Sequence, residues 1–376
     1  MPEVKAFLRA TYGPSFYGAD DVYFDWFYLR NPCSWFAPRL AKGSIPVNAI
    51  RSADGQIGAV HAYLPFDAAT PWGGNAGVWD IEWINGSGIR GAGRALVHHL
   101  LRDVDVYGGF GCNELSEKAF RKIGLEVRPE IPRCVWLLDA KGLDRAAAES
   151  GVSLAMREYA QQECRAGGAT FHPIALESVP EAVFRPTLRT IRWGAGRCRA
   201  WFDWRYSNHP FIRYDAIGAD PAGLDGIAVV RLESVAGTEL KVCRIVDFFV
   251  QADRLPGLLA AVIGFAKREG CLLADYFNTS NDVAARVRGG SVGAGLDVLA
   301  NPRLPFMFQP LAMASRNSIN FVSSSGEKAA QPIDFGDFYA TKADANQDIL
   351  RTLSSAPVLG SIAAPGTAAG SRTQCP

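Results

Sequence analysis

Apolar positions in the first third of the chain follow two different periods. Residues 45–52, 55–66 and 76–84 alternate apolar and polar side chains or form short apolar runs, which predicts three strands. The next segment has helical spacing, with one apolar face made of Leu96, Val97, Leu100, Leu101 and Val104. Strands followed by a helix predict a mixed sheet with helices packed against it.

A second strand and helix follow in the same style. We expect Gly108-Gly109 to end the first helix and residues 109–112 to form a short strand. Asn113 is a suitable N-cap, and Gly124 is a suitable residue just after the helix end. The apolar face expected between them consists of Leu115, Ala119, Phe120 and Ile123. Residues 127–139 are predicted to be extended again.

Two segments of the first half return in the second half. "YFDWFYLRNP" at residues 23–32 recurs as "WFDWRYSNHP" at 201–210, and "GLEVRPEIPR" at 124–133 resembles "GLDVLANPRLP" at 295–305. Two echoes in the same order at nearly one offset indicate a duplicated unit. We expect Trp26 and Trp204 to be core anchors, and Asp25 and Asp203 to hold the motif to its sheet.

The repeats predict the domain organisation. We expect a first domain at 1–140, a linker helix at 141–170, a second domain at 171–322 and a C-terminal extension at 323–376. The extension is predicted to dock on the second domain through Phe335, Phe338 and Tyr339. Its last fifteen residues or so have too little apolar surface to stay folded.

Composition limits the classes of partner. Of 376 residues, 39 are Lys or Arg and 38 are Asp or Glu, so the overall charge gives no sign of a nucleic-acid partner. We expect no signal peptide, and the longest apolar run, from residue 255, is too short to span a bilayer. The eight cysteines form no CxxC pair and no zinc-ligand cluster. We therefore expect a cytoplasmic protein without a metal.

A glycine-rich stretch, "GSGIRGAGRAL" at residues 86–96, connects a predicted strand to a predicted helix. Unpaired N–H groups and the helix dipole make such a helix start an anion site, and glycines let a phosphate approach the backbone. The stretch matches neither the dinucleotide-binding glycine pattern nor the P-loop. A plain flexible turn is the alternative.

This loop, with "NELSEKAFRKIGL" from residue 113, resembles the GNAT (Gcn5-related N-acetyltransferase) superfamily. The resemblance covers roughly residues 40–140 and implies an α+β fold: two tandem GNAT-like domains, each a mixed, mostly antiparallel sheet flanked by helices. It also implies that acetyl-CoA, as co-substrate, contacts Ile81, Trp83, Gly88, Arg90, Gly91, Ala92, Gly93, Arg94, Asn113, Phe120 and Lys122. A softer resemblance links the Phe-Asp-Trp motif to GNAT-like proteins of surface-polysaccharide synthesis.

The sequence departs from the family pattern at three places. Gly88 replaces a Gln or Arg of the loop, and Phe120 replaces the Tyr that often protonates the leaving thiolate. The second half has a comparable strand at 242–250 but no Gly-x-Gly at the start of the next helix. We expect the second domain to have lost the pyrophosphate loop.

Candidate proton acceptors lie on the strand before the loop. Acetyl transfer to an amine needs a base, and Asp80 and Glu82 are equal candidates, expected on one face opposite Trp79, Ile81 and Trp83. Each could instead be an ordinary ion-paired carboxylate. Asp247 in the second half is either a substrate-orienting acid or, twice as readily, a structural one. His61 is expected to be a packed core residue.

Three functions follow from these patterns. The first is an acyl-CoA-dependent N-acyltransferase acting on the amine of a small molecule, with an amino sugar of surface glycans as one acceptor. The departures at Gly88 and Phe120 favour a second, a non-catalytic GNAT-like binding protein. The third is an aminoacyl-tRNA-dependent peptidyl transferase, which the near-zero net charge disfavours.

Overall fold

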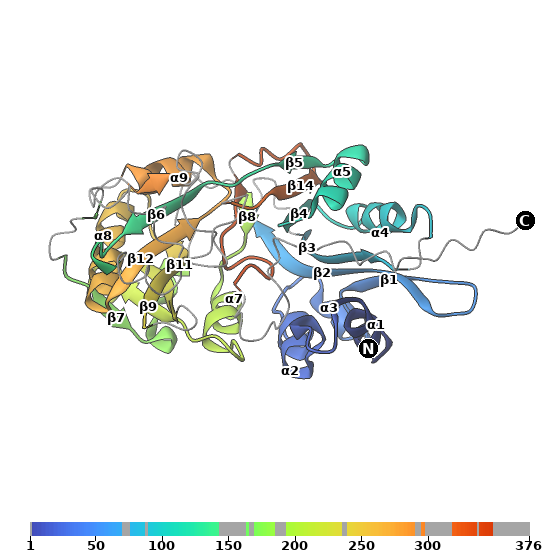
Figure 1. The fold of residues 1–376 in the computed structure, drawn as a ribbon, viewed down its shortest axis with the longest axis horizontal. Coiled ribbons are helices and arrows are strands. Elements are labelled where there is room, and N and C mark those ends of the chain that lie inside the picture. Colours follow the sequence, from blue (N-terminus) through green and yellow to red (C-terminus); the bar gives the residue numbers. More distant parts are fainter. Residues whose placement is uncertain are drawn as a thin grey trace, which may run out of the picture.

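The structure, a computed structural model, describes residues 2–69, 76–86, 89–142, 163–164, 169–184, 193–234, 239–289, 295–297, 318–336 and 338–348. It contains two mixed sheets with helices packed against both faces, the α+β arrangement of two similar units that the sequence predicts (Figure 1). Most of the predicted linker and the last residues of the extension lie outside the described residues.

Within the described residues, the first sheet has eight strands. In spatial order they are β15 (Phe338–Tyr339), β8 (Trp193–Ala195), β2 (Ile57–Ala69), β3 (Ala76–Asn85), β4 (Val106–Phe110), β14 (Phe321–Ser325) and β5 (Glu126–Arg128), with β1 (Val47–Arg51) paired to β2. Strands β1, β2 and β3 confirm the three strands expected from the alternating pattern.

The second sheet has seven strands in the part of the chain that the structure describes. Their order is β13 (Leu296–Asp297), β6 (Arg133–Leu137), β12 (Cys271–Phe277), β11 (Lys241–Phe249), β10 (Ile227–Ser234), β9 (Asp215–Gly218) and β7 (His172–Ile174).

Helices divide into two groups. On the N-terminal segments of the two halves lie α1 (Pro2–Tyr12), α2 (Asp21–Phe24), the π-helix η2 (Asp25–Leu29), α3 (Ala37–Leu40), α7 (Arg199–Phe202) and the π-helix η6 (Asp203–Ser207). Behind the sheets lie α4 (Ala92–Leu101), α5 (Glu114–Lys122), α8 (Leu255–Arg268) and α9 (Asn281–Arg288). Short 3-10 turns are η1 (Tyr17–Ala19), η4 (Leu176–Ser178) and η5 (Glu181–Phe184).

The two halves exchange strands. β6 precedes residue 140 yet pairs with β12 and β13 of the second sheet, whereas β14, near residue 322, pairs with β4 and β5 of the first. The sheets therefore do not coincide with the division at 140 and 322 drawn from the repeats. Each sheet needs a strand from the other half, so the two units are tied together through their ladders (Figure 1).

Besides a small cluster of Ala59, Ala92 and Leu96, three large apolar clusters fill the described part of the molecule. One lies between the two sheets and the N-terminal helices of both halves, one between the first sheet and α4 and α5, and one between the second sheet and α8 and α9. The C-terminal segment 338–348 runs through the central cluster, and nearly all of its described residues are buried. Phe338 packs on Trp79 of the first half as well, so the extension docks on both halves and not on the second alone.

The repeated motif forms the contact between the halves. Trp26 and Trp204 are buried, their rings stack with centroids 5.1 Å apart, and each indole N–H donates to the other's backbone carbonyl at 3.0 and 2.9 Å. Both are core anchors, as predicted. Asp25 and Asp203 do not hold the motif to a sheet: they are partly exposed and pair with Arg30 and Arg199.

Two local predictions around α5 need correction. Gly108 and Gly109 do not end a helix but lie inside β4. Glycine is needed there because a Cβ would lie 2.5 Å from the Trp79 ring at position 108 and 2.9 Å from Val322 at position 109. Leu115 is 68% exposed and lies off the apolar face. Asn113 does cap α5, accepting from the Ser116 amide at 2.9 Å, an interaction typically worth about 1 kcal/mol.

Within the described residues, no helix is long and apolar enough to cross a membrane, and no cluster of His, Cys, Asp or Glu has the arrangement of a metal site.

Candidate functional site

A bulge in β3 sets the geometry of the candidate site. Tyr63 of β2 lies opposite Asp80, and the preceding β2 residue, Ala62, lies opposite Glu82. Ile81 is therefore an extra residue with no residue opposite it on β2. Because residues directly opposite each other share a face, Asp80 lies on the Tyr63 face and Glu82 on the Ala62 face. The prediction that Asp80 and Glu82 share a face was therefore wrong.

The bulge also separates the residues predicted to lie opposite the two acids. Trp79 and Ile81 pack in the central cluster, whereas Trp83 packs with α4 and α5. Ile84 joins the central cluster, as expected once the alternation has shifted by one residue.

Beyond the bulge, β3 and β4 separate. Their parallel pairing covers Gly77 to Asp80 on β3 and Val106 to Gly109 on β4, although β3 continues to Asn85. We call this separation the first fork. Among the described residues, no strand pairs with β3 beyond Asp80 on the side of β4. Backbone groups on that edge are free to pair with an extended, amide-bearing ligand.

The start of α4 lies next to the end of β3. Gly91, its N-cap, has φ 84° and nothing within 4 Å of the position that a Cβ would take, and no side chain of the described residues caps the helix. Arg90 and Arg94 are exposed beside it, while Ala92 is buried. These features are typical of an anion-binding helix start. Gly88 lies outside the described residues.

Gly93 has a packing role. A Cβ there would lie 2.8 Å from the Trp83 ring, whose indole N–H donates to the Gly93 carbonyl at 3.1 Å. Trp83 in turn stacks on Phe120, with centroids 4.5 Å apart. Phe120 is completely buried, so it supports the wall of the fork through Trp83. Lys122 is exposed at the end of α5.

Glu82 is the acid with the most perturbed environment. It is half-buried and accepts a hydrogen bond from the Tyr12 hydroxyl of α1 at 2.7 Å. Burial, helped by nearby Asp80, raises the pKa of Glu82 to about 8 despite the hydrogen bond from Tyr12. A carboxyl group with such a pKa exchanges protons near neutral pH, as a general base must.

Tyrosines surround Glu82. Tyr17 and Tyr28 are buried, and their pKa values are raised first by burial and also by the nearby Glu82 charge. Tyr12 is affected in the same way. These phenols stay protonated at neutral pH, so they are available as hydrogen-bond donors.

Asp80 has a different partner. Its side chain is 12% exposed and lies 3.1 Å from Nε2 of His61, which is fully buried on β2. Tyr107 of β4 lies 3.5 Å from the same nitrogen. His61 is a packed residue, as expected, but its contact with Asp80 was not foreseen. Of the two candidate bases, Glu82 is the one without a basic partner among the described residues.

The second sheet has a bulge at the equivalent place. Val229 of β10 lies opposite Asp247 and Val230 opposite Ile245, which leaves Val246 as the extra residue. Asp247 therefore corresponds to Glu82, the residue just after the bulge. The parallel pairing of β11 and β12 ends at Arg244 and Asp275, while β11 continues to Phe249, which forms a second fork.

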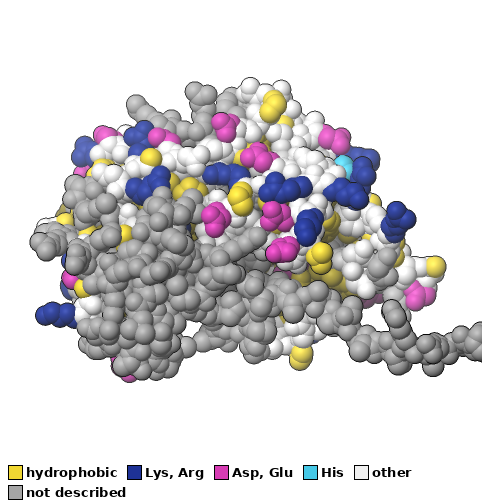
Figure 2. Space-filling model, turned by 45° about the horizontal axis from the view of Figure 1, so that its top comes forward, with side chains coloured by type: hydrophobic (Ala, Val, Ile, Leu, Met, Phe, Trp, Pro, Cys, Tyr) yellow, Lys and Arg dark blue, Asp and Glu magenta, His cyan; other side chains and the backbone are white. Residues whose placement is uncertain are grey.

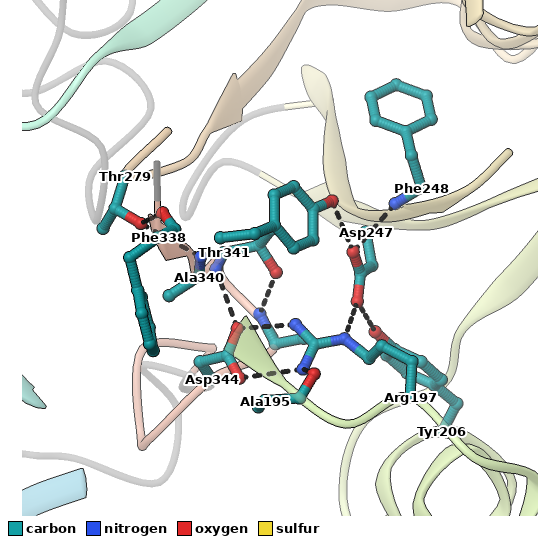
Figure 3. Close-up of polar contacts among 12 residues, drawn as sticks. Ala195, Arg197, Tyr206, Asp247, Phe248, Thr279, Phe338, Ala340, Thr341 and Asp344 are labelled. Carbon is teal, nitrogen blue, oxygen red and sulfur yellow. Dashed lines mark hydrogen bonds and ion pairs between the residues drawn. The ribbon is translucent and has the colours of Figure 1, made fainter. Parts of the chain in front are cut away.

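The protein's own chain fills the second fork. Tyr339 of the C-terminal segment donates to Asp247 at 2.8 Å, and Ala340 accepts from the Thr279 amide, just beyond β12 (Figure 3). Arg197 binds Asp247 at 2.7 Å and Asp344 at 2.6 Å. Tyr206, the repeat counterpart of Tyr28, donates to Asp247 at 3.2 Å. Asp247 is fully buried and belongs to an ion-pair network. Of the two roles considered for it, this arrangement fits a structural acid and not one that orients substrate.

The start of α8 also differs from that of α4. Its N-cap is Arg254, at φ −91°, and Pro256 occupies the first turn, so one backbone donor is missing. Only the first fork lies beside a helix start of the predicted phosphate-binding kind, among the residues that the structure describes.

Sequence reasoning missed Tyr12, Arg197 and Asp344. Tyr12 lies in α1, 70 residues from Glu82, and no local pattern marks it. Arg197 and Asp344 are 147 residues apart. All three lie outside the repeated motif, so the repeat gave no signal for them either.

Comparisons with known proteins concern the fold. No protein-family model and no curated protein matches the chain. The chain is similar to a probable N-acyltransferase of unknown function from Enterococcus faecalis (12% identity over 79% of this chain and 66% of that one, TM-score 0.47). The chain is also similar to a GCN5-related N-acetyltransferase from Anabaena variabilis, at 12% identity over 74% of this chain and 62% of that one, with a TM-score of 0.45.

A third similar structure is Saccharomyces cerevisiae N-myristoyltransferase with bound myristoyl-CoA, at 11% identity over 77% of this chain and 74% of that one, with a TM-score of 0.43. The chain thus spans less than two thirds of the first two structures. At these identities and TM-scores the likeness assigns no activity to this chain.

Proposed function

We propose that the protein is an acyl-CoA-dependent N-acyltransferase whose active site is the first fork. The observation that carries the proposal is Glu82, a carboxyl group with a pKa raised to about 8, placed by the Ile81 bulge where β3 leaves β4. Acetyl-CoA as donor and a small-molecule amine as acceptor, an amino sugar of surface glycans among them, belong to the proposal.

The residues of the fork suit such a co-substrate. The uncapped start of α4, with Gly91 open and with Arg90 and Arg94 beside it, offers backbone N–H groups and positive charge to a pyrophosphate. The free edge of β3 beyond Asp80 offers hydrogen bonds to the amides of a pantetheine arm. Acyl-CoA supplies a thioester carbon that an amine can attack.

Glu82 supplies the acid–base step. In its ionised form it accepts a proton from the acceptor ammonium, which leaves a neutral amine able to attack the thioester. Tyr12, hydrogen-bonded to Oε2, keeps the carboxylate oriented. With a pKa near 8, about a tenth of Glu82 is ionised at pH 7, and the protonated carboxyl can return its proton to the departing thiolate.

One observation favours a non-catalytic binding protein instead. Phe120 is completely buried and stacked on Trp83, so the position of the family's Tyr can donate no proton. Such a protein would bind acyl-CoA at the same fork without turnover. The tRNA-dependent alternative finds no support on the face in Figure 2, where Lys and Arg lie interleaved with Asp and Glu.

Turnover of acetyl-CoA with a panel of primary amines tests the proposal. We expect release of the free thiol with at least one amine, and a decrease in kcat of about 100- to 10,000-fold in Glu82→Gln, which keeps the shape but not the base. Asp80→Asn is the matched control and should lose less. Binding of acetyl-CoA without turnover of any amine would favour the binding protein.

A further inference from the structure

Arg205 occupies a position that the other copy of the motif fills with a core residue. In the repeat it corresponds to Phe27, and both side chains are buried, at 1% and 0% exposure. Phe27 packs on Tyr23 and Trp26, as a core aromatic should. A guanidinium at the same depth is costly unless something pairs with its charge.

The partners of this guanidinium are incomplete. Nε and Nη2 of Arg205 are buried without a hydrogen-bond partner among the described residues, and the face of the Trp26 ring lies 5.6 Å away. Asp348 is near enough for Arg205 to lower the pKa of its carboxyl, but neither an ion pair nor a hydrogen bond joins the two among the described residues. Nε and Nη2 form one edge of the guanidinium and donate in parallel. Two parallel N–H groups fit the two oxygens of a carboxylate or phosphate.

The buried carboxylates nearby already bind other cations. Asp348 accepts from Arg231 at 2.7 Å and from the Tyr214 hydroxyl at 2.7 Å. Asp247 is bound by Arg197, and Asp275 by Arg133 and Arg244. Within the described residues, none of them forms an ion pair with Arg205.

His209 adds a second donor at the same place. Its ring packs on Trp26 with centroids 4.2 Å apart, so it lies on the same indole as Arg205. Nδ1 accepts from the amides of Phe211 and Ile212 at 3.1 and 3.0 Å. Burial and nearby Arg205 lower the pKa of His209 to about 3, so the neutral ring carries its proton on Nε2. That nitrogen is buried and unpartnered among the described residues.

Ring contacts lead from this pair of donors toward the candidate active site, because Tyr23 packs on Trp26 with centroids 5.5 Å apart and Tyr17 packs on Tyr23 with centroids 5.2 Å apart. The hydroxyl of Tyr23 lies within electrostatic reach of both Arg205, which lowers its pKa, and Glu82, which raises it, although burial has the largest effect. The π-helix η6 that carries Arg205 also carries Tyr206, the ligand of Asp247. π-Helical turns are frequent at functional sites.

We propose that Arg205 and His209 form an anion-binding site that holds the carboxylate or phosphate of the acceptor, so that the acceptor is an amine carrying an anionic group. This assignment of acceptor class rests on the proposed function. The binding of an anion at Arg205 does not.

Thermal unfolding tests the site without turnover. We expect succinate or inorganic phosphate to raise the Tm of the wild type above that in sodium chloride of equal ionic strength, and one of the two anions to do so more strongly. Arg205→Met should lose at least about tenfold in affinity, since two charge-assisted hydrogen bonds disappear. Arg213→Met, which removes an exposed arginine, should behave like the wild type.

A second variant covers a failure of Arg205→Met to fold. Arg205→Lys keeps the charge but lacks the two-donor edge, and it should also bind the anion about tenfold more weakly. No anion effect in the wild type, or the same effect in Arg205→Lys or Arg205→Met as in the wild type, overturns the proposal.

The acceptor class is then tested with matched pairs of amines, such as phosphoethanolamine with ethanolamine and 4-aminobutyrate with propylamine. We expect kcat/KM to favour the member with the additional anionic group at least about tenfold, and Arg205→Lys to abolish this preference. Anion binding without any acyl transfer would support the anion site and refute the proposed function. Acyl transfer without a preference for anionic amines would refute the assignment of the acceptor.

Discussion

Glu82 and Asp247 lie at equivalent positions of two similar sheets but differ in burial and in hydrogen-bond partners. Each follows a one-residue bulge, at Ile81 and Val246, where the parallel pairing of the sheet ends. Glu82 is half-buried, and its only described hydrogen-bond partner is the Tyr12 hydroxyl. Asp247 is fully buried and bound by Arg197, Tyr206 and Tyr339 (Figure 3).

The difference shows that the same separation of two strands can form a ligand site or an internal contact of the chain. A separated pair of strands exposes backbone edges and an acid, which must be used by a ligand or covered by the chain. In the second half the C-terminal segment 338–344 covers them, which stabilises the contact between the halves. In the first half no described strand covers the edge beside the start of α4, as the proposed function requires.

Asp247→Ala should have the largest effect on stability. It leaves Arg197 with one carboxylate fewer and two buried tyrosine hydroxyls without their acceptor, so we expect a loss of about 3–5 kcal/mol in the free energy of unfolding. Urea denaturation measures it. Glu82→Ala removes the equivalent acid of the first fork and should cost less than about 1 kcal/mol. Equal losses would show that the two acids are both structural.

The two helix starts should respond with opposite signs to one added methyl group. Gly93→Ala places a Cβ against the Trp83 ring and should destabilise the protein by about 1–3 kcal/mol. Gly257→Ala in α8 meets nothing within 4 Å and lies in a helix, so it should stabilise by about 0.5–1 kcal/mol. Urea denaturation of both variants gives the two signs. A stable Gly93→Ala variant would show that Trp83 does not pack as described.

The pH dependence of stability should report on Glu82. Its pKa rises from the ordinary 4.5 to about 8 on folding, so the folded state binds the extra proton between these values and loses stability as pH rises through 8. Glu82→Gln has no such loss. We therefore expect the Tm of Glu82→Gln relative to wild type to increase from pH 5 to pH 9. A difference that stays constant with pH would mean that the pKa of Glu82 is not raised.

Local features were predictable where neighbouring residues determine them. The strands β2 and β3, the Asn113 cap and the burial of Trp26 and Trp204 all follow from short sequence patterns. Gly124 takes φ 89° just beyond α5, as a residue ending a helix in this way does.

Features that depend on distant pairing were not predictable. The bulge at Ile81 arises from the register between β2 and β3, and no residue type marks it, so the faces of Asp80 and Glu82 were assigned incorrectly. Gly108 and Gly109 look like a turn, but they lie in strand β4. They are glycines because Trp79 and Val322 leave no room for a Cβ there. The exchange of β6 and β14 joins residues far apart in the chain.

Calorimetric titration with acetyl-CoA tests the central claim, that of the two forks only the first binds acyl-CoA. Gly91→Asp and Gly91→Asn are a matched pair, because both residues tolerate φ 84° and differ in charge alone. Gly257→Asp places the same charge at the start of α8. We predict one site per chain, lost in Gly91→Asp, largely kept in Gly91→Asn and unchanged in Gly257→Asp. Binding that survives in Gly91→Asp, or that Gly257→Asp abolishes, would contradict the account.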